Sequence, residues 1–256
     1  MIKVAVCGAL GRMGTIIIKM IDEDPELEFV GGIDLRSGVV LDCPVVESAK
    51  MDSFLKEVQP DCLIDFTVAS ASVRNIQVAA SNGVALVVGT TGFSDEDELK
   101  IKKATEGSVP IVKTTNFSVG VNIFWQLIRH AAALLPDYDC EVIEAHHRYK
   151  KDAPSGTART IISILEEEMG SREKQYGRVG MTERGNEIGV HVIRGGDIVG
   201  DHSVMFSGNF ETIELSHRAY DRSVFARGAI RAAKWVPGQP AGIYTMKEVL
   251  GLDSKL

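Results

Sequence analysis

Near its N-terminus the chain reads Val4-Ala5-Val6-Cys7-Gly8-Ala9-Leu10-Gly11-Arg12-Met13-Gly14, a short apolar strand that runs into a glycine-rich turn and the start of a helix. Such a turn lets the backbone approach a pyrophosphate and aims free helix N–H groups at the phosphate oxygens. The glycines at 8, 11 and 14 depart from the commonest Gly-x-Gly-x-x-Gly fingerprint. From the motif alone, a tight turn without a ligand therefore stays open as the alternative.

The surroundings of this turn favour a dinucleotide site. A second apolar strand is expected over residues 28–33, and Asp34 stands at its end, about 20 residues after Gly14. A carboxylate at that place accepts hydrogen bonds from ribose hydroxyls. Asp34 favours NADH, whereas Arg36 keeps NADPH open, because it could meet a 2′-phosphate or be a solvated loop cation.

Apolar strands alternate with helices from the N-terminus to about residue 117. This alternation predicts an α/β fold, a Rossmann-like domain in which a parallel sheet is covered by helices on both faces. Gly89-Thr90-Thr91-Gly92 closes one strand at the carboxyl edge of the sheet, where ligands of such folds bind, although an ordinary turn is the alternative. Strands are expected at 2–7, 28–33, 62–66, 84–88 and 109–112, and helices at 11–22, 72–81 and after residue 94.

The pattern changes after residue 117, where strands with one polar face predict a second α+β domain with an open, mixed sheet. We place this substrate-binding domain at residues 118–222. A helix over 223–236 and the short tail are expected to return to the first domain, which then comprises 1–117 and 223–256. In the second domain, strands are expected at 140–145, 188–194, 202–206 and 211–216, and helices at 121–135 and 156–169.

A second run, Glu144-Ala145-His146-His147-Arg148-Tyr149-Lys150-Lys151-Asp152-Ala153-Pro154-Ser155-Gly156-Thr157, collects cationic side chains before a helix start, whose free N–H groups make a second anion pocket. This pairing fits a substrate with two carboxylates. Side chains of adjacent strand residues point to opposite sides, so at most one of His146 and His147 is expected to face the chemistry. One imidazole can protonate a carbon or nitrogen. Surface or core histidines and a solvated Lys-Lys pair are the alternatives, and we expect no metal, because no spaced His or Cys partner completes a tetrahedral set.

Composition narrows the class of protein. The 256 residues are 45% hydrophobic and 25% charged, which is typical of a globular protein. A net charge of −7 argues against nucleic acid as the main partner. No apolar run approaches the roughly 20 residues of a membrane span, and no leader precedes the first strand, so we expect a cytoplasmic protein. The four widely spaced cysteines are expected to be reduced thiols.

The chain resembles the 4-hydroxy-tetrahydrodipicolinate reductases, also called dihydrodipicolinate reductases, of the diaminopimelate route to lysine. The resemblance runs nearly end to end. It is carried by Gly8-Ala9-Leu10-Gly11-Arg12-Met13-Gly14, Val88-Gly89-Thr90-Thr91-Gly92-Phe93, Asn116-Phe117-Ser118-Val119-Gly120-Val121-Asn122, the run from Glu144 to Ala158, and Glu214-Leu215-Ser216-His217-Arg218-Ala219.

The resemblance implies an oxidoreductase that transfers hydride from NADH, NADPH or both to carbon 4 of a cyclic unsaturated dicarboxylate. The 4-hydroxyl group leaves as water, and the product is tetrahydrodipicolinate. It further implies a homotetramer in which second-domain sheets associate, with a hinge that closes the two domains over the ligand. Thr114-Thr115 and Leu35 depart from common family patterns near the cofactor and leave the preference between NADH and NADPH open.

The resemblance also assigns roles to residues of this chain. His146 corresponds to a general acid or base, and Lys150 to a proton donor that also contacts substrate. His147, Gly156 and Thr157 correspond to residues that bind a substrate carboxylate. Cofactor contacts correspond to Gly8, Ala9, Leu10, Gly11, Arg12, Met13, Asp34, Gly89, Thr90, Thr91, Thr114, Thr115, Asn116 and Phe117.

Two other hypotheses stay open at this point. One is another NAD(P)-dependent dehydrogenase of similar plan that acts on an amino or keto dicarboxylate. The other is a noncatalytic nucleotide-binding sensor that responds to redox state. A sensor would have no need of His146 or Lys150, and the chain has both.

Overall fold

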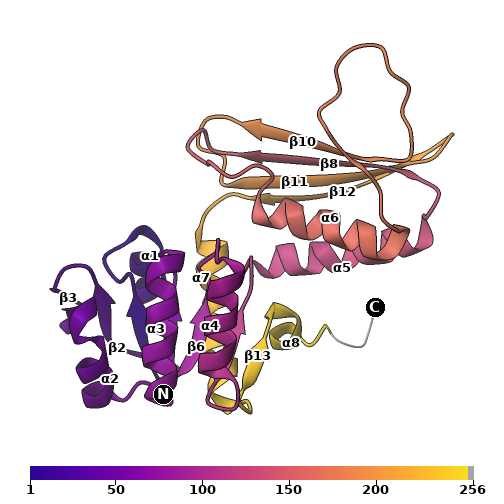
Figure 1. Cartoon of the computed structure of the whole chain (residues 1–256). Helices are drawn as coiled ribbons and strands as arrows, with labels where there is room; N and C mark the ends of the chain where they lie inside the picture. Colours follow the sequence, from indigo (N-terminus) through magenta and orange to yellow (C-terminus); the bar gives the residue numbers. More distant parts are fainter. Residues whose placement is uncertain (253–256) are drawn as a thin grey trace. The chain divides into compact units, whose positions relative to one another are not determined.

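The computed structural model describes residues 1–252, which fall into two units (Figure 1). Within the described residues, the first unit combines Met1–Val119 with residues 223–252, and the second unit is Gly120–Arg222. Among the described helices, none has both the length and the apolar character needed to cross a membrane.

An eight-stranded sheet forms the centre of the first unit, with the strand order β13-β7-β6-β5-β1-β2-β4-β3. Every pairing is parallel except that of β3 with β4. The predicted Rossmann-like fold is therefore confirmed. The strands are β1 (Ile2–Cys7), β2 (Leu27–Asp34), β3 (Gly38–Val40), β4 (Cys43–Glu47), β5 (Cys62–Asp65), β6 (Ala85–Val88), β7 (Pro110–Lys113) and β13 (Gly242–Tyr244).

Helices cover both faces of this sheet, and β1 shows how its faces divide. Val4 and Val6 pack in a core shared with α1 and α7, whereas Ala5 and Cys7 pack in a core shared with α2, α3 and α4. Successive strand side chains point to opposite faces, so a strand covered on both sides must be apolar throughout. The helices are α1 (Arg12–Asp22), α2 (Met51–Val58), α3 (Ala69–Ser81), α4 (Asp95–Thr105), α7 (Ser223–Trp235) and α8 (Met246–Leu250), with short 3₁₀ turns η1 (Ser48–Lys50) and η2 (Val236–Gly238).

The C-terminal part of the first unit is built into the same sheet. Strand β13 extends the sheet edge by pairing in parallel with β7. Helix α7 lies so close to the segment after β7 that a Cβ added to Gly228 would stand 1.7 Å from the carbonyl oxygen of Phe117. A glycine is therefore required where α7 meets this backbone.

The second unit contains a five-stranded mixed sheet, as predicted, with the order β12-β11-β8-β10-β9. Strands β8, β10 and β9 are parallel, and β11 runs antiparallel to both of its neighbours. Figure 1 shows helices α5 and α6 side by side beneath this sheet. The elements are α5 (Val119–Leu134), β8 (Asp139–His146), α6 (Gly156–Met169), β9 (Lys174–Tyr176), β10 (Ile188–Arg194), β11 (Gly200–Ser207) and β12 (Thr212–Ala219).

Strand β8 carries polar residues on the face that the helices cover. Every second residue of β8 is buried, beginning with Cys140 and Val142, which pack in the core shared with α5 and α6. The same alternation continues to Glu144 and His146 at the end of the strand, and both are buried. A carboxylate and an imidazole thus stand at the margin of an apolar core, where burial of a polar group is costly unless it is paired.

Replacing Gly228 with Ala is expected to lower the free energy of unfolding, because the new Cβ cannot avoid the Phe117 carbonyl unless α7 moves. Overpacking of this kind typically costs about 1–3 kcal/mol. Chemical denaturation followed by circular dichroism measures the change. The control is Gly238→Ala, where no atom lies within 4 Å of the added Cβ, and its expected effect is within about 0.5 kcal/mol. Equal stability of the two variants would contradict the close packing of α7.

Candidate functional site

The glycine turn in the first unit joins β1 to α1 and has little room for side chains. Gly8 has a φ of +71°, a left-handed conformation that favours glycine. A Cβ added to Gly14 would lie 2.1 Å from the Gly8 carbonyl oxygen. Gly11 occupies the N-cap position of α1 and has no side chain to cap the helix. The first N–H groups of α1 are thus left for an external acceptor such as a phosphate oxygen.

Asp34 ends β2 beside this turn and holds part of it in place. Its Oδ2 accepts a hydrogen bond from the Leu10 N–H at 2.9 Å, and its Oδ1 accepts one from the Leu35 N–H at 2.7 Å. Each carboxylate oxygen has two lone pairs, so capacity for ribose hydroxyls remains. The structure therefore gives Asp34 a second task, the positioning of Leu10, that sequence analysis did not anticipate.

The four segments predicted to contact a cofactor lie at one edge of the first sheet. Residues 8–13 follow β1, Asp34 ends β2, residues 89–91 follow β6 and residues 114–117 follow β7. These strands are parallel and close together in the sheet order. Their carboxyl ends therefore meet at one edge, which is where ligands of open α/β sheets bind.

Asp65 is a site residue that sequence reasoning missed. It ends β5, is fully buried, and accepts hydrogen bonds from the Thr67 N–H at 2.8 Å and from Asn75 Nδ2 at 3.0 Å. It also accepts from Thr67 Oγ1 at 2.7 Å and from Thr90 Oγ1 at 3.3 Å. One buried carboxylate thus ties the loop after β5 to the loop after β6, in which Gly89 lets the chain pass close to the Phe66 ring.

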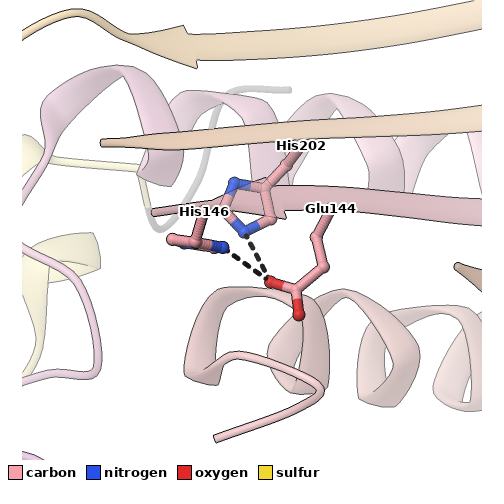
Figure 2. Close-up of side chains that lie close together, drawn as sticks. All are labelled: Glu144, His146 and His202. Atoms are coloured by element: carbon pink, nitrogen blue, oxygen red, sulfur yellow. Dashed lines mark ion pairs between the residues drawn. The ribbon is translucent and has the colours of Figure 1, made fainter. Parts of the chain in front are cut away.

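In the second unit, three buried side chains converge near the end of β8 (Figure 2). Glu144 Oε2 lies 3.0 Å from His146 Nδ1 and 3.8 Å from His202 Nε2. The sheet register explains the meeting, because His202 of β11 stands directly opposite Glu144. The two imidazole rings meet edge to face, with centroids 5.1 Å apart.

The other oxygen of Glu144 is engaged by two donors. Glu144 Oε1 accepts the Ser155 N–H at 2.9 Å and Arg194 Nη2 at 3.0 Å. Burial alone would raise the pKa of Glu144, but the contacts from His146, Ser155 and Arg194 outweigh burial and hold that pKa well below its usual range. Glu144 is therefore a buried, ionised carboxylate.

Helix α6 begins beside this group. Ser155 is its N-cap, and Ser155 Oγ accepts the Ala158 N–H at 3.2 Å and lies 3.2 Å from His202 Nε2. Gly156 and Thr157 are the first residues of the helix, so their N–H groups have no acceptor within it. The predicted anion pocket thus adjoins the predicted proton-transfer histidine.

The predicted cations after β8 are only partly available to a ligand. Lys150 Nζ forms an ion pair with Asp152 Oδ1 at 2.9 Å, and the Lys150 N–H donates to the His147 carbonyl oxygen at 3.1 Å. His147 is half-buried, and Lys151 is exposed. Arg194, to which sequence analysis gave no role, also donates to the Asp152 carbonyl oxygen at 2.6 Å.

The group of Glu144, His146 and His202 has the residue types that could hold a divalent cation, and its candidate ligand atoms all lie within 4.8 Å of one another. The Arg194 guanidinium already contacts Glu144 and would repel a cation there. Arginine and lysine near the site instead favour an anionic ligand. The arrangement therefore fits proton transfer to a carboxylate substrate better than metal binding.

The two halves of the chain match family models described as dihydrodipicolinate reductase, N-terminus, over residues 2–117 and dihydrodipicolinate reductase, C-terminus, over residues 120–250. The chain is 68% identical to a 4-hydroxy-tetrahydrodipicolinate reductase of Methanocorpusculum labreanum over 98% of this chain and all of that protein. A protein of the same name from Methanoculleus marisnigri is also 68% identical, with the same coverage.

A solved structure is similar along most of the chain. It is the dipicolinate-bound dihydrodipicolinate reductase from Paenisporosarcina sp. TG-14, with a TM-score of 0.80 and 25% identity, covering 96% of this chain and 97% of that one. The similarity to reductases thus spans both units.

Mildly acidic pH is expected to destabilise the folded protein, because the His202 side chain binds a proton more readily in the unfolded chain than in the folded one. Burial, reinforced by the positive field of His146, lowers the pKa of His202 to about 3 from its ordinary value of 6.5. Between these values the unfolded chain binds more protons than the folded one. The free energy of unfolding therefore falls with decreasing pH across this window, by at most about 1.4 kcal/mol per pH unit.

Urea unfolding from about pH 7 to about pH 5 measures this dependence in the wild-type protein and in His202→Gln. The variant is expected to show the shallower dependence. Burial lowers the pKa of His217 too, but His217 is present in both proteins. The lowered pKa of Glu144 acts only below the ordinary value of a carboxylate. Identical slopes would show that His202 is not held neutral by the fold.

Proposed function

This chain belongs to the dihydrodipicolinate reductase family, and we propose on that basis that it reduces 4-hydroxy-tetrahydrodipicolinate to tetrahydrodipicolinate with NADH or NADPH, releasing water. The step belongs to lysine and diaminopimelate biosynthesis. One observation in particular supports it: Glu144 contacts both the imidazole of His146 and the first turn of α6. A candidate proton donor and a candidate carboxylate pocket therefore share one buried anchor.

The first unit is a dinucleotide-binding fold, and the residues at its carboxyl edge fit a nicotinamide cofactor. The open N-terminus of α1 suits the pyrophosphate, and Asp34 suits the adenine ribose. When bound, the cofactor supplies the hydride. The proposed contacts are Gly8, Ala9, Leu10, Gly11, Arg12, Met13, Asp34, Gly89, Thr90, Thr91, Thr114, Thr115, Asn116 and Phe117.

The second unit holds the groups for the substrate in this proposal. The N–H groups of Gly156 and Thr157 donate hydrogen bonds to one substrate carboxylate at the start of α6, with His147 and Lys150 beside it. His146 serves as general acid or base, and Lys150 donates a proton to the carbon skeleton. The ammonium group of Lys150 forms an ion pair with Asp152 at 2.9 Å. This ion pair must break before Lys150 can contact the substrate.

We extend the proposal to a cytoplasmic homotetramer formed through the second sheet. The face of that sheet away from α5 and α6 carries Ile143 and Met205, with Ile193 51% exposed. The same face also carries charged side chains, such as Glu141 and Arg218, and a mixture of apolar and polar groups is usual where two copies of a protein associate. All four cysteines are free thiols, which fits a reducing compartment. Light scattering on the purified protein measures the assembly.

The reductase assay follows oxidation of NADH and of NADPH while the preceding synthase generates the cyclic substrate in the same cuvette. We expect oxidation only when both synthase substrates are present, and an unchanged rate when EDTA is added. A rate lost with EDTA and restored by Zn²⁺ would assign an ion to Glu144, His146 and His202. Binding of cofactor without oxidation would indicate a different dicarboxylate substrate or a redox sensor.

Replacing Lys150 with Ala is expected to lower kcat by about 10²- to 10⁴-fold, the usual contribution of a positioned proton donor. The fold should persist, because the ion pair with Asp152 is partly exposed and such pairs contribute about 0–1 kcal/mol. Lys150→Arg keeps the charge but not a transferable proton, so substrate binding should recover more than turnover does. The matched control is Lys103→Ala, at an exposed position of α4. Near-normal turnover of Lys150→Ala would remove this lysine from the mechanism.

A further inference from the structure

We propose that Glu144 is a positioning residue that holds the proton-transferring imidazole of His146 and the carboxylate-binding start of α6 in one fixed geometry. This inference rests on the proposed reductase function and deepens it. Neither the comparisons nor the resemblance gives Glu144 a role.

Glu144 is 1% exposed and stands at the margin of an apolar core. Burial of a carboxylate costs several kcal/mol unless charged and hydrogen-bonding partners compensate. If position 144 served only to pack the end of β8, an apolar residue would fill it without the free-energy cost of burying a charge. The residue instead gathers partners from three other segments, which are β10, β11 and the start of α6.

The two oxygens of Glu144 serve the two halves of the site. Oε1 accepts the Ser155 N–H at 2.9 Å and thereby fixes the residue that caps α6. Oε2 faces His146 Nδ1 at 3.0 Å. The imidazole of His146 and the N-cap of α6 are therefore held next to each other by the two oxygens of one carboxylate.

The contact between Glu144 and His146 is short but poorly aligned. Neither Glu144 Oε2 nor His146 Nδ1 has a hydrogen bond of good geometry, although both atoms are buried. Catalytic hydrogen bonds are often poorly aligned before the ligand binds and tighten in the complex. Gly200 spares this imidazole a close contact on its other side, because a Cβ at position 200 would lie 3.1 Å from His146 Nε2.

The remaining partners keep the carboxylate from turning away. Arg194 Nη2 donates to Glu144 Oε1 at 3.0 Å and also to the backbone carbonyl oxygen of Asp152. The side chain of Asp152 in turn forms an ion pair with Lys150. His202 closes the other side, with its Nε2 near both Oε2 and Ser155 Oγ. One continuous set of contacts thus joins His146 to Lys150, the two residues proposed to move protons.

The experiment compares the wild-type protein with Glu144→Gln, which keeps the shape of the side chain and removes its charge. We expect kcat to fall by about 100-fold, in the range of lost acid–base catalysis, with a much smaller change in the KM for the dicarboxylate. NADH affinity should be unchanged, since the cofactor residues belong to the first unit. Rates are expressed per NADH-binding site, so that an unfolded fraction does not count as lost turnover. The control is Glu167→Gln, which disrupts an exposed pair with Arg129.

The outcomes separate the inference from the function on which it depends. An inactive wild-type protein would overturn the reductase proposal. An active wild-type protein with an equally active Glu144→Gln variant would overturn only the positioning role. A variant with a reduced melting temperature but full turnover per binding site would show that Glu144 is merely structural.

A second measurement tests the contact if Glu144→Gln does not fold. Dipicolinate and NADH are added to the ¹⁵N-labelled wild-type protein, and the imidazole N–H signals are followed by NMR. We expect a downfield Nδ1–H signal, protected from solvent exchange, that His146→Gln abolishes. If no such signal forms with both ligands bound, the Glu144 to His146 hydrogen bond does not exist and the inference fails.

Discussion

The second unit depends on an ionised carboxylate held at the margin of an apolar core. Glu144 is placed there by the alternation of β8, which turns Cys140, Val142 and Glu144 toward the same helix-covered face. An unpaired charge in this position would destabilise the fold by several kcal/mol. The fold avoids that cost with donors from β10 and the start of α6. The contacts that compensate the charge are therefore the same contacts that bring these segments together at the site.

The first unit follows the same physical rule with Asp65. This carboxylate also ends a strand, is fully buried, and accepts hydrogen bonds from Thr67, Asn75 and Thr90. Loops at the carboxyl ends of strands can vary in sequence, but their backbone must be held in a fixed position to bind a ligand. In both units a buried carboxylate fixes the loops, because the loops donate hydrogen bonds to it. A loop that moved away would leave the carboxylate without a donor.

Features that depend on a local sequence pattern could be predicted from the sequence. The apolar runs, the glycine turn and the helix start after Pro154 predicted the parallel first sheet, the mixed second sheet and the placing of His146 beside an anion pocket. Strands β3, β4, β9 and β13 were not predicted, because runs of three to five residues carry too little periodicity. His202 and Arg194 were quoted only as strand residues. Their roles arise from the register of β10 and β11 against β8, which no local pattern encodes.

The charge state of the site explains how Glu144 is held. Glu144 is ionised and His202 is neutral, since burial lowers the pKa of His202 to about 3. A neutral His202 carries no positive charge that could compete with the Arg194 guanidinium, so Arg194 and the Ser155 N–H are the donors that compensate the carboxylate. Both donors reach the end of β8 only through the tertiary fold of the second unit, and loss of either contact would leave a buried charge poorly compensated. The geometry of the site and the stability of the second unit therefore depend on the same two contacts.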